Sequence, residues 1–167
     1  LTYDGTAPTM DITSDTVTSG STTNDASIQL TFTASEATTD FVAGDITVTG
    51  GALSATLVTD EDNKIYTINL TPTGEVTCTV NVQAGTFTDA AGNGNSAATE
   101  FSWTYDSTAP TLSDVSIVSS NSTNTHAKVG DVITLTMTAD ETITQPTVTF
   151  TSGITDITDT TITYNNT

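Results

Sequence analysis

The sequence predicts an all-β protein made of tandem β-sandwiches, and three observations support this prediction. The phrase Tyr-Asp-Gly-Thr-Ala-Pro-Thr at residues 3–9 returns, with Ser in place of Gly, at residues 105–111. A spacing of about 100 residues fits a β-sandwich and is too long for a solenoid repeat. Thr, a β-branched residue enriched in strands, supplies about a quarter of the chain. Short segments of alternating apolar and polar residues recur between turn signals, as half-buried strands require.

The first copy begins with three predicted strands. Residues 10–12 alternate directly after Pro8, which suits the start of a strand. Residues 28–34 place Ile, Leu, Phe and Ala on one face and Gln and Thr on the other. Residues 46–48 carry Ile and Val at alternate positions and lead into the turn signal Gly-Gly at residues 50–51.

Four further predicted strands complete the first copy. Residues 53–57 carry Leu, Ala and Leu at alternate positions, and residues 66–70 carry Tyr, Ile and Leu in the same way. Residues 76–82 alternate Val and Cys with polar residues, and residues 101–105 follow a Gly/Asn-rich loop with Phe, Trp and Tyr. Seven short strands with turns between them describe one complete immunoglobulin-like β-sandwich.

The second copy repeats the first half of this plan. Its predicted strands lie around Leu112, Val115 and Ile117, over residues 133–139, and around Val148 and Phe150. We expect residues 1–5 to be the tail of a preceding repeat, 6–106 the first domain and 107–167 an incomplete second domain. The strands that would complete the second domain are expected from a continuation of the chain or from a neighbouring subunit, and both sources remain open.

Several phrases follow one another in order along the first copy. They are Ala-Pro-Thr at 7–9, Phe-Thr-Ala-Ser-Glu at 32–36, Asp-Ile-Thr-Val-Thr-Gly-Gly at 45–51, Tyr-Thr-Ile-Asn-Leu-Thr-Pro at 66–72 and Thr-Asp-Ala-Ala-Gly-Asn at 88–93. The phrase at 32–36 returns at 137–141 as Met-Thr-Ala-Asp-Glu. In these phrases the chain resembles the bacterial Ig-like repeats of large extracellular surface proteins and adhesins. The resemblance implies tandem sandwiches that serve as stalks, spacers, fibre modules or ligand binders.

The charge balance excludes two classes of partner. Lys and Arg number 2 against 20 Asp and Glu, so the formal net charge is −18. Such a surface repels phosphate, so we expect no nucleic-acid partner and no anionic membrane partner. No apolar run approaches the roughly 18 residues that cross a bilayer, so direct membrane insertion is not expected, and any export signal or anchor is expected outside this sequence.

Acidic residues gather in loops that an immunoglobulin-like sandwich brings to one pole. Asp4 precedes the first strand, Glu36 follows the second, and Asp89 lies in the last long loop. Calcium favours about six to eight oxygen ligands, and the family resemblance also points to calcium at domain junctions. We therefore expect these three residues to form one calcium site. The ligands expected at the next junction are Asp106, Asp140 and Glu141, with Glu75 able to reach them.

Two alternatives remain beside the calcium prediction. The acids could simply solvate loop tips, because the sequence holds no calcium loop of the Asp-x-Asp-x-Asp-Gly type. Glycans could also decorate the surface, since Asn69, Asn121 and Asn165 each begin an Asn-x-Ser/Thr acceptor pattern and outward threonines suit O-linked sugar. In a chain so rich in Ser and Thr, such acceptor patterns also arise by chance.

The remaining chemically distinctive residues point away from catalysis. Cys78 has no cysteine partner and is expected to be a small buried residue. Trp103 and Tyr105 alternate with Phe101, which favours core packing over a sugar-binding platform. His126 lies in a polar loop with no nucleophile and base to complete a triad.

The function expected from these observations is structural. We expect an extracellular, non-enzymatic segment of a surface filament, stalk or adhesin shaft, glycosylated and stiffened by calcium. The expected partners are neighbouring Ig-like repeats or identical subunits in a fibre, together with attached glycans. The alternative is an adhesin module that binds carbohydrate or another ligand, and it would expose aromatic side chains on a concave patch.

Overall fold

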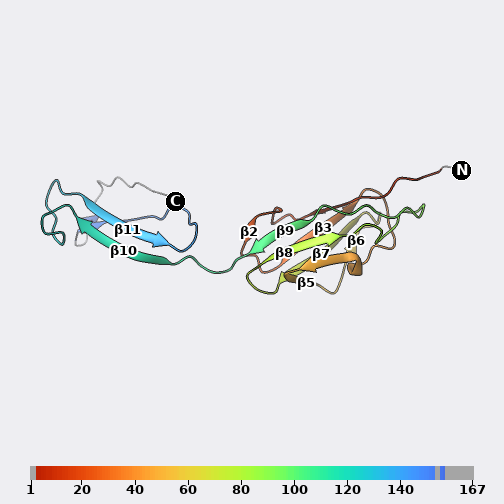
Figure 1. Ribbon diagram of the computed structural model, residues 1–167, viewed down its shortest axis with the longest axis horizontal. Helices are drawn as coiled ribbons and strands as arrows, with labels where there is room; N and C mark the ends of the chain where they lie inside the picture. Colours follow the sequence, from red (N-terminus) through yellow and green to blue (C-terminus); the bar gives the residue numbers. More distant parts are fainter. Residues whose placement is uncertain (1–2, 153–154, 157–167) are drawn as a thin grey trace. The chain divides into compact units, whose positions relative to one another are not determined.

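The computed structural model describes residues 3–152 and 155–156. The chain divides into two compact units, Leu1–Ser107 and Thr108–Thr167, each of which is described by itself. Figure 1 shows that the described elements of both units are strands, apart from one short 3₁₀ turn. The predicted all-β fold class is confirmed.

One sheet of the first unit is antiparallel throughout. Its strand order is β1-β3-β7-β5, and the short strand β6 also pairs with β7. The strands are β1 (Met10–Thr13), β3 (Ile28–Ala34), β5 (Gly51–Leu53), β6 (Val58–Thr59) and β7 (Ile65–Pro72). The register places Phe32 of β3 opposite Ile12 of β1 and Tyr66 of β7. Alternate residues of β3 are buried, as the period-two pattern predicts.

The second sheet of the first unit has the order β2-β9-β8-β4. Its strands are β2 (Thr22–Thr23), β4 (Ile46–Thr49), β8 (Val76–Val82) and β9 (Phe101–Tyr105), and the 3₁₀ turn η1 (Ala43–Asp45) leads into β4. The central pairs are antiparallel, whereas β2 pairs with β9 in parallel. Sequence patterning did not indicate β2, because two threonines in a polar loop carry no alternation.

One hydrophobic core joins the two sheets into a sandwich. It takes Ile28, Leu30 and Phe32 from one sheet and Val80, Val82 and Trp103 from the other. Three core residues come from connecting segments instead of strands: Val17, Phe41 and Phe87. The ring centroid of Phe41 lies 5.7 Å from that of Phe32, 5.1 Å from that of Tyr66 and 5.4 Å from that of Phe87. Aromatic pairs at such separations add to burial in holding the loops on the core.

The predicted strand at residues 53–57 is wrong as a single element. The structure contains β5 and β6 in its place, separated by residues 54–57, and both pair with β7. Leu53 and Leu57 are half-buried against the core, whereas Ala55 is exposed. The apolar alternation therefore reflects contact with the core, while the ladder itself is interrupted.

The second unit contains an antiparallel pair, β10 (Leu112–Ser119) and β11 (Ile133–Ala139). The register shifts between Ser113 and Ser116, and Asp114 there has a φ of 50°. This irregularity is a β-bulge, in which β10 has one residue more than β11 between two paired positions. The extra residue lets Val115 face the same side as Leu112, which explains why these two apolar residues are three positions apart and not two. Two short strands, β12 (Thr151–Ser152) and β13 (Thr155–Asp156), also pair antiparallel.

The predicted strand around Val148 and Phe150 is wrong, because residues 143–150 have no regular secondary structure. The corresponding strand of the first unit, β4, owes its ladder to β8, with Ile46 opposite Val82 and Thr49 opposite Thr79. The described part of the second unit contains no counterpart of β8. An apolar alternating segment without a neighbouring strand has no partner for its backbone groups and forms no ladder.

Within the described residues, no helix has both the length and the apolar character that crossing a membrane requires.

Candidate metal site

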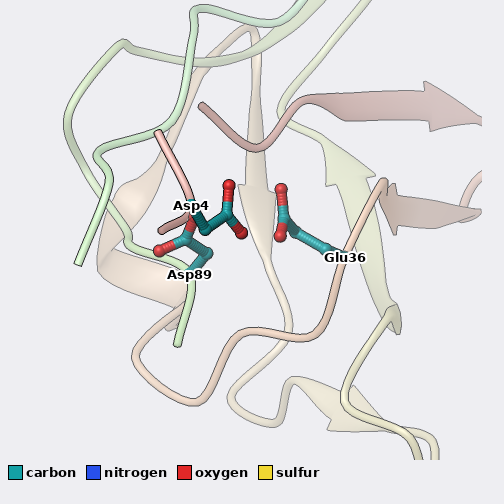
Figure 2. Close-up of side chains that lie close together, drawn as sticks. All are labelled: Asp4, Glu36 and Asp89. Atoms are coloured by element: carbon teal, nitrogen blue, oxygen red, sulfur yellow. The ribbon is translucent and has the colours of Figure 1, made fainter. Parts of the chain in front are cut away.

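Three carboxylates from distant parts of the first unit meet at one pole of the sandwich. Asp4 precedes β1, Glu36 follows β3, and Asp89 lies between β8 and β9. One carboxylate oxygen from each residue lies within 4.8 Å of the others. Figure 2 shows the carboxylates of Asp4 and Glu36 facing each other, with Asp89 beside Asp4. The expectation that these three residues would gather therefore agrees with the geometry, whereas cation binding stays a prediction.

Asp89 is the most firmly positioned of the three. Its Oδ1 accepts hydrogen bonds from the backbone N–H groups of Ala91 and Asn93, each at 2.8 Å, and its Oδ2 accepts one from Asn93 Nδ2 at 2.8 Å. The side-chain hydrogen bond from Asn93, followed by the backbone bonds, holds the pKa of Asp89 below its usual value. Asp89 is only 6% exposed. The turn therefore presents a buried carboxylate that remains charged at neutral pH.

Asp4 belongs to the lead-in segment, residues 4–9, which lies against the first unit at several points. Asn93 Nδ2 donates to the carbonyl oxygen of Asp4 at 3.2 Å, so one amide binds both Asp89 and the backbone of Asp4. Further along, the N–H of Ser96 donates to the carbonyl oxygen of Pro8 at 3.0 Å, and Pro8 is fully buried. These contacts bring the exposed Asp4 side chain to the cluster.

Glu36 is half-buried, and its loop is joined to the Asp89 loop through Asp40. The Thr88 N–H donates to both carboxylate oxygens of Asp40, at 3.0 and 3.1 Å, and the Thr88 hydroxyl donates at 2.8 Å. The Asp40 carboxylate also accepts a bond of 2.7 Å from the buried Thr38 hydroxyl. Burial alone would raise the pKa of Asp40, but the bonds from Thr88 and Thr38 outweigh it and lower the pKa.

Asn95 is a further supporting residue that the sequence did not indicate. It is 3% exposed, and its Oδ1 accepts hydrogen bonds from the N–H groups of Thr86 and Phe87 at 2.8 and 3.0 Å. Its Nδ2 donates to the carbonyl oxygens of Gln83 and Ser96 at 2.8 and 2.9 Å. The four shorter bonds all go to backbone groups, and the Thr86 hydroxyl adds a longer one to Oδ1 at 3.5 Å, so Asn95 fixes the path of the loop that carries Asp89. No pattern in the sequence distinguishes it from an ordinary loop asparagine.

The cluster is suited chemically to a hard divalent cation. Three carboxylates held this close repel one another, and a cation between them relieves the repulsion. Because Asp89 Oδ1 already accepts two hydrogen bonds, Asp89 would contribute through Oδ2. Asp4 Oδ1 likewise accepts the N–H of Thr6 at 3.0 Å. An ion here would complete its coordination with water, as calcium does readily.

The comparisons with known proteins agree with the fold. A family model described as the bacterial Ig-like domain matches residues 4–105. The chain belongs to the bacterial Ig-like domain family. Bacterial Ig-like domains are commonly parts of extracellular proteins and are typically non-enzymatic. The comparisons with curated proteins and with solved structures gave no match. The family resemblance seen in the sequence is confirmed by the family match.

The residues predicted for the second calcium site do not all belong to one unit. Asp106 belongs to the first unit, whereas Asp140 and Glu141 belong to the second. Both carboxylate oxygens of Asp140 accept hydrogen bonds from Thr111, from its N–H at 2.8 Å and from its hydroxyl at 2.5 Å. Glu75, expected near this junction, accepts a bond of 3.0 Å from the Ser107 hydroxyl. Cation binding at the second junction stays a prediction.

The glycan acceptors differ in their surroundings. Asn69 is exposed on the outer face of β7. Asn121 is half-buried, and its Nδ2 donates to Asp131 Oδ2 at 2.8 Å, so the nitrogen that would carry a sugar is already bonded. Asn165 lies outside the described residues. Of the two described acceptors, Asn69 has the more accessible side chain.

The residues expected to be structural occupy structural positions. Trp103 is 1% exposed and packs in the core, as predicted, while Tyr105 is half-buried. Cys78 is buried, its thiol donates to the Gly50 carbonyl oxygen at 3.4 Å, and burial raises the pKa of the thiol. His126 is exposed in its loop, with Nδ1 at 3.1 Å from the hydroxyl of Thr125.

Proposed function

We propose that this bacterial Ig-like protein is an extracellular spacer: a stiff tandem segment of a surface stalk, adhesin shaft or filament. The observation that carries the proposal is the short connection between the two units. On the first unit, the N–H of Asp106 donates to the Thr23 carbonyl oxygen at 3.0 Å, and the Ser107 hydroxyl donates to Glu75 at 3.0 Å. On the second unit, Thr111 is bound to Asp140.

Only residues 108–110 lie between Ser107 and Thr111, the two positions that these hydrogen bonds fix, and the sequence of this segment restricts its backbone. Pro110 fixes its own φ, and it confines Ala109 to extended conformations. A flexible linker would instead be long and rich in Gly and Ser. A chain that repeats such junctions transmits force along its length and holds a distal tip away from the cell surface.

The placement of the aromatic residues supports a spacer over a binding module. The rings of Phe32, Phe41, Tyr66, Phe87, Phe101 and Trp103 are all buried in the core. Tyr3, at 94% exposure, is the one large exposed aromatic side chain in the described part of the first unit, and it directly precedes the lead-in segment. A sugar-binding platform requires exposed rings that converge on one patch.

In this proposal calcium has a structural role. Asp4 is the residue that the lead-in segment contributes to the cluster, while Glu36 and Asp89 belong to the body of the domain. A cation bound by all three would therefore fix the lead-in segment on the domain pole. Its role would be mechanical and would not involve chemistry on a substrate.

Glycans complete the proposal at the domain surface. We place an N-linked glycan at Asn69, whose exposed side chain lies on β7, in preference to Asn121, whose amide is bonded to Asp131. A glycan on an outer sheet face would shield neighbouring edge strands from unwanted pairing with other chains.

Electron microscopy of the native surface material, labelled with an antibody against residues 4–105, tests the spacer directly. We expect the label to mark threads of beads joined end to end, at a distance from the cell envelope. Labels confined to compact particles, or to the interior of the cell, would contradict the proposal.

A further inference from the structure

The same hydrogen-bonded arrangement occurs in both units, directly after the Pro of the repeated phrase. In the first unit, the Thr9 N–H donates to Ser35 Oγ at 3.0 Å, and the Ser35 N–H donates to the Thr9 carbonyl oxygen at 3.0 Å. In the second unit, the Thr111 N–H donates to Asp140 Oδ1 at 2.8 Å, and the Asp140 N–H donates to the Thr111 carbonyl oxygen at 3.2 Å. We call this arrangement the strand clamp.

The sequence repeat shows that the two clamps are equivalent. Thr9 and Thr111 both follow Ala-Pro. Ser35 and Asp140 both stand between Ala and Glu, Ser35 directly after β3 and Asp140 directly after β11. The register agrees, because the first pair inside each clamp is Met10 with Ala34 in one unit and Leu112 with Ala139 in the other. Asp140 therefore occupies the position of Ser35, and Glu141 occupies that of Glu36.

We propose that Asp140 is the residue that fixes the linker to the domain that follows it. The inference deepens the proposed function: the clamp is argued from its hydrogen bonds, and its role in stiffening the linker rests on the proposed spacer. Both oxygens of Asp140 are bonded to Thr111, whereas Ser35 offers a single oxygen to Thr9. In the first unit, Ser96 adds a bond to Pro8 from the loop between β8 and β9. The described part of the second unit has no such loop, and there the Asp140 carboxylate makes a stronger clamp than the Ser35 hydroxyl makes in the first unit.

The equivalence provides a matched pair of variants. Asp140→Ser restores the group that the first unit uses naturally, whereas Asp140→Ala removes the acceptor altogether. NMR on the full chain measures the rate of amide hydrogen exchange at the Thr111 N–H, which the clamp should protect. The exchange rates of the β10 and β11 amides show whether the second unit is still folded. We expect exchange at Thr111 to be about tenfold faster in Asp140→Ala, the factor that one lost hydrogen bond produces, and nearly unchanged in Asp140→Ser.

A second pair of variants covers the case in which Asp140→Ala unfolds the second unit. Ser35→Ala and Ser35→Asp make the same comparison at the Thr9 N–H, in the unit with a complete sandwich. We expect Ser35→Ala to lose protection and Ser35→Asp to keep it. Equal exchange at Thr111 in all chains that fold, or equal exchange at Thr9 in the Ser35 pair, would overturn the clamp.

The proposed function can fail separately. If Thr111 is protected in the natural chain while NMR relaxation shows the two units tumbling independently, the clamp stands and the stiff spacer does not. If Asp140→Ser exchanges as fast as Asp140→Ala, the equivalence of the two positions is wrong, whatever the stiffness of the linker.

Discussion

The carboxylate of Asp40 accepts two hydrogen bonds from the N–H of Thr88 and a third from its hydroxyl, across 48 residues of sequence. This contact joins the loop that carries Glu36 to the loop that carries Asp89. The spacing of those two carboxylates is therefore set by the protein before any ion arrives, which is the preorganisation that a binding site requires.

Asp40→Asn should weaken this connection, because the amide cannot accept hydrogen bonds at both terminal atoms. We expect the free energy of unfolding to fall by about 1 kcal/mol, a reduced value because the side chain is exposed to screening by water. Urea denaturation measures the change. Asp62→Asn, which removes the same charge from an exposed loop position, is the matched control. Equal effects of the two substitutions would show that the bonds to Thr88 contribute nothing.

Acid should destabilise the domain through its hydrogen-bonded carboxylates. The pKa of Asp60 is lowered by the N–H groups of Lys64 and Ile65, that of Asp89 by Asn93, and that of Asp40 by Thr88 against the effect of burial. A carboxylate whose pKa is lower in the folded state stabilises the fold above its unfolded pKa, and this stabilisation is lost as the pH falls through the folded pKa.

We therefore expect the free energy of unfolding to be level near neutral pH and to fall below about pH 4. Urea titrations at a series of pH values, in about 0.5 M salt to screen the net negative charge, provide the test. The pH dependence should be shallower in Asp40→Asn. If the free energy of unfolding rose steadily as the pH was lowered in high salt, these carboxylates would not stabilise the fold as proposed.

Calcium should raise the melting temperature of the first domain, since an ion that binds only the folded state stabilises it by mass action. We expect a shift of about 5 °C at saturating calcium, abolished by a chelator. Glu36→Gln should remove the response, while Glu61→Gln, at an exposed loop position, should retain it. Identical melting curves with calcium and with chelator would leave the three carboxylates as solvated loop groups.

Gly50 should tolerate no side chain. Its φ is +72°, and a Cβ there would lie 2.6 Å from the Thr77 carbonyl oxygen. Gly50→Ala should lower the free energy of unfolding by about 2 kcal/mol or more, because backbone strain and a backbone clash add. Gly20→Ala isolates the strain alone, as Gly20 has a φ of +87° with nothing within 4 Å. A smaller loss at position 50 than at position 20 would refute the clash.

Alternation predicted the strands that are half-buried in a continuous ladder, such as β3 and β7, because the side-chain period of two is then visible in the sequence. It could not indicate Phe41 and Phe87, which reach the core from loops where no period exists. It also mistook the segment around Phe150 for a strand, since apolar alternation records which side chains face inward and not whether a neighbouring strand is present.

The acidic cluster was predictable for a different reason. The topology of a sandwich brings the lead-in segment and the loops after β3 and β8 to one pole, so three acids in those segments could be placed together from strand order alone. Their supports, Asp40 and Asn95, depend on individual hydrogen bonds to backbone groups. The role of Asp140 could not be predicted either. In the sequence it is one acidic residue among many, and only the structure shows its two hydrogen bonds to Thr111.

Small-angle X-ray scattering on two complete domains tests the stiff spacer most directly. Residues 4–105 joined in tandem restore the phrase Tyr-Asp-Gly-Thr-Ala-Pro-Thr at the junction, and a second chain carries about ten Gly and Ser residues inserted there as a flexible reference. We predict that the tandem scatters as one elongated particle with a narrow distribution of sizes, and that the insertion broadens the distribution. Indistinguishable, broad distributions for the two chains would contradict the account.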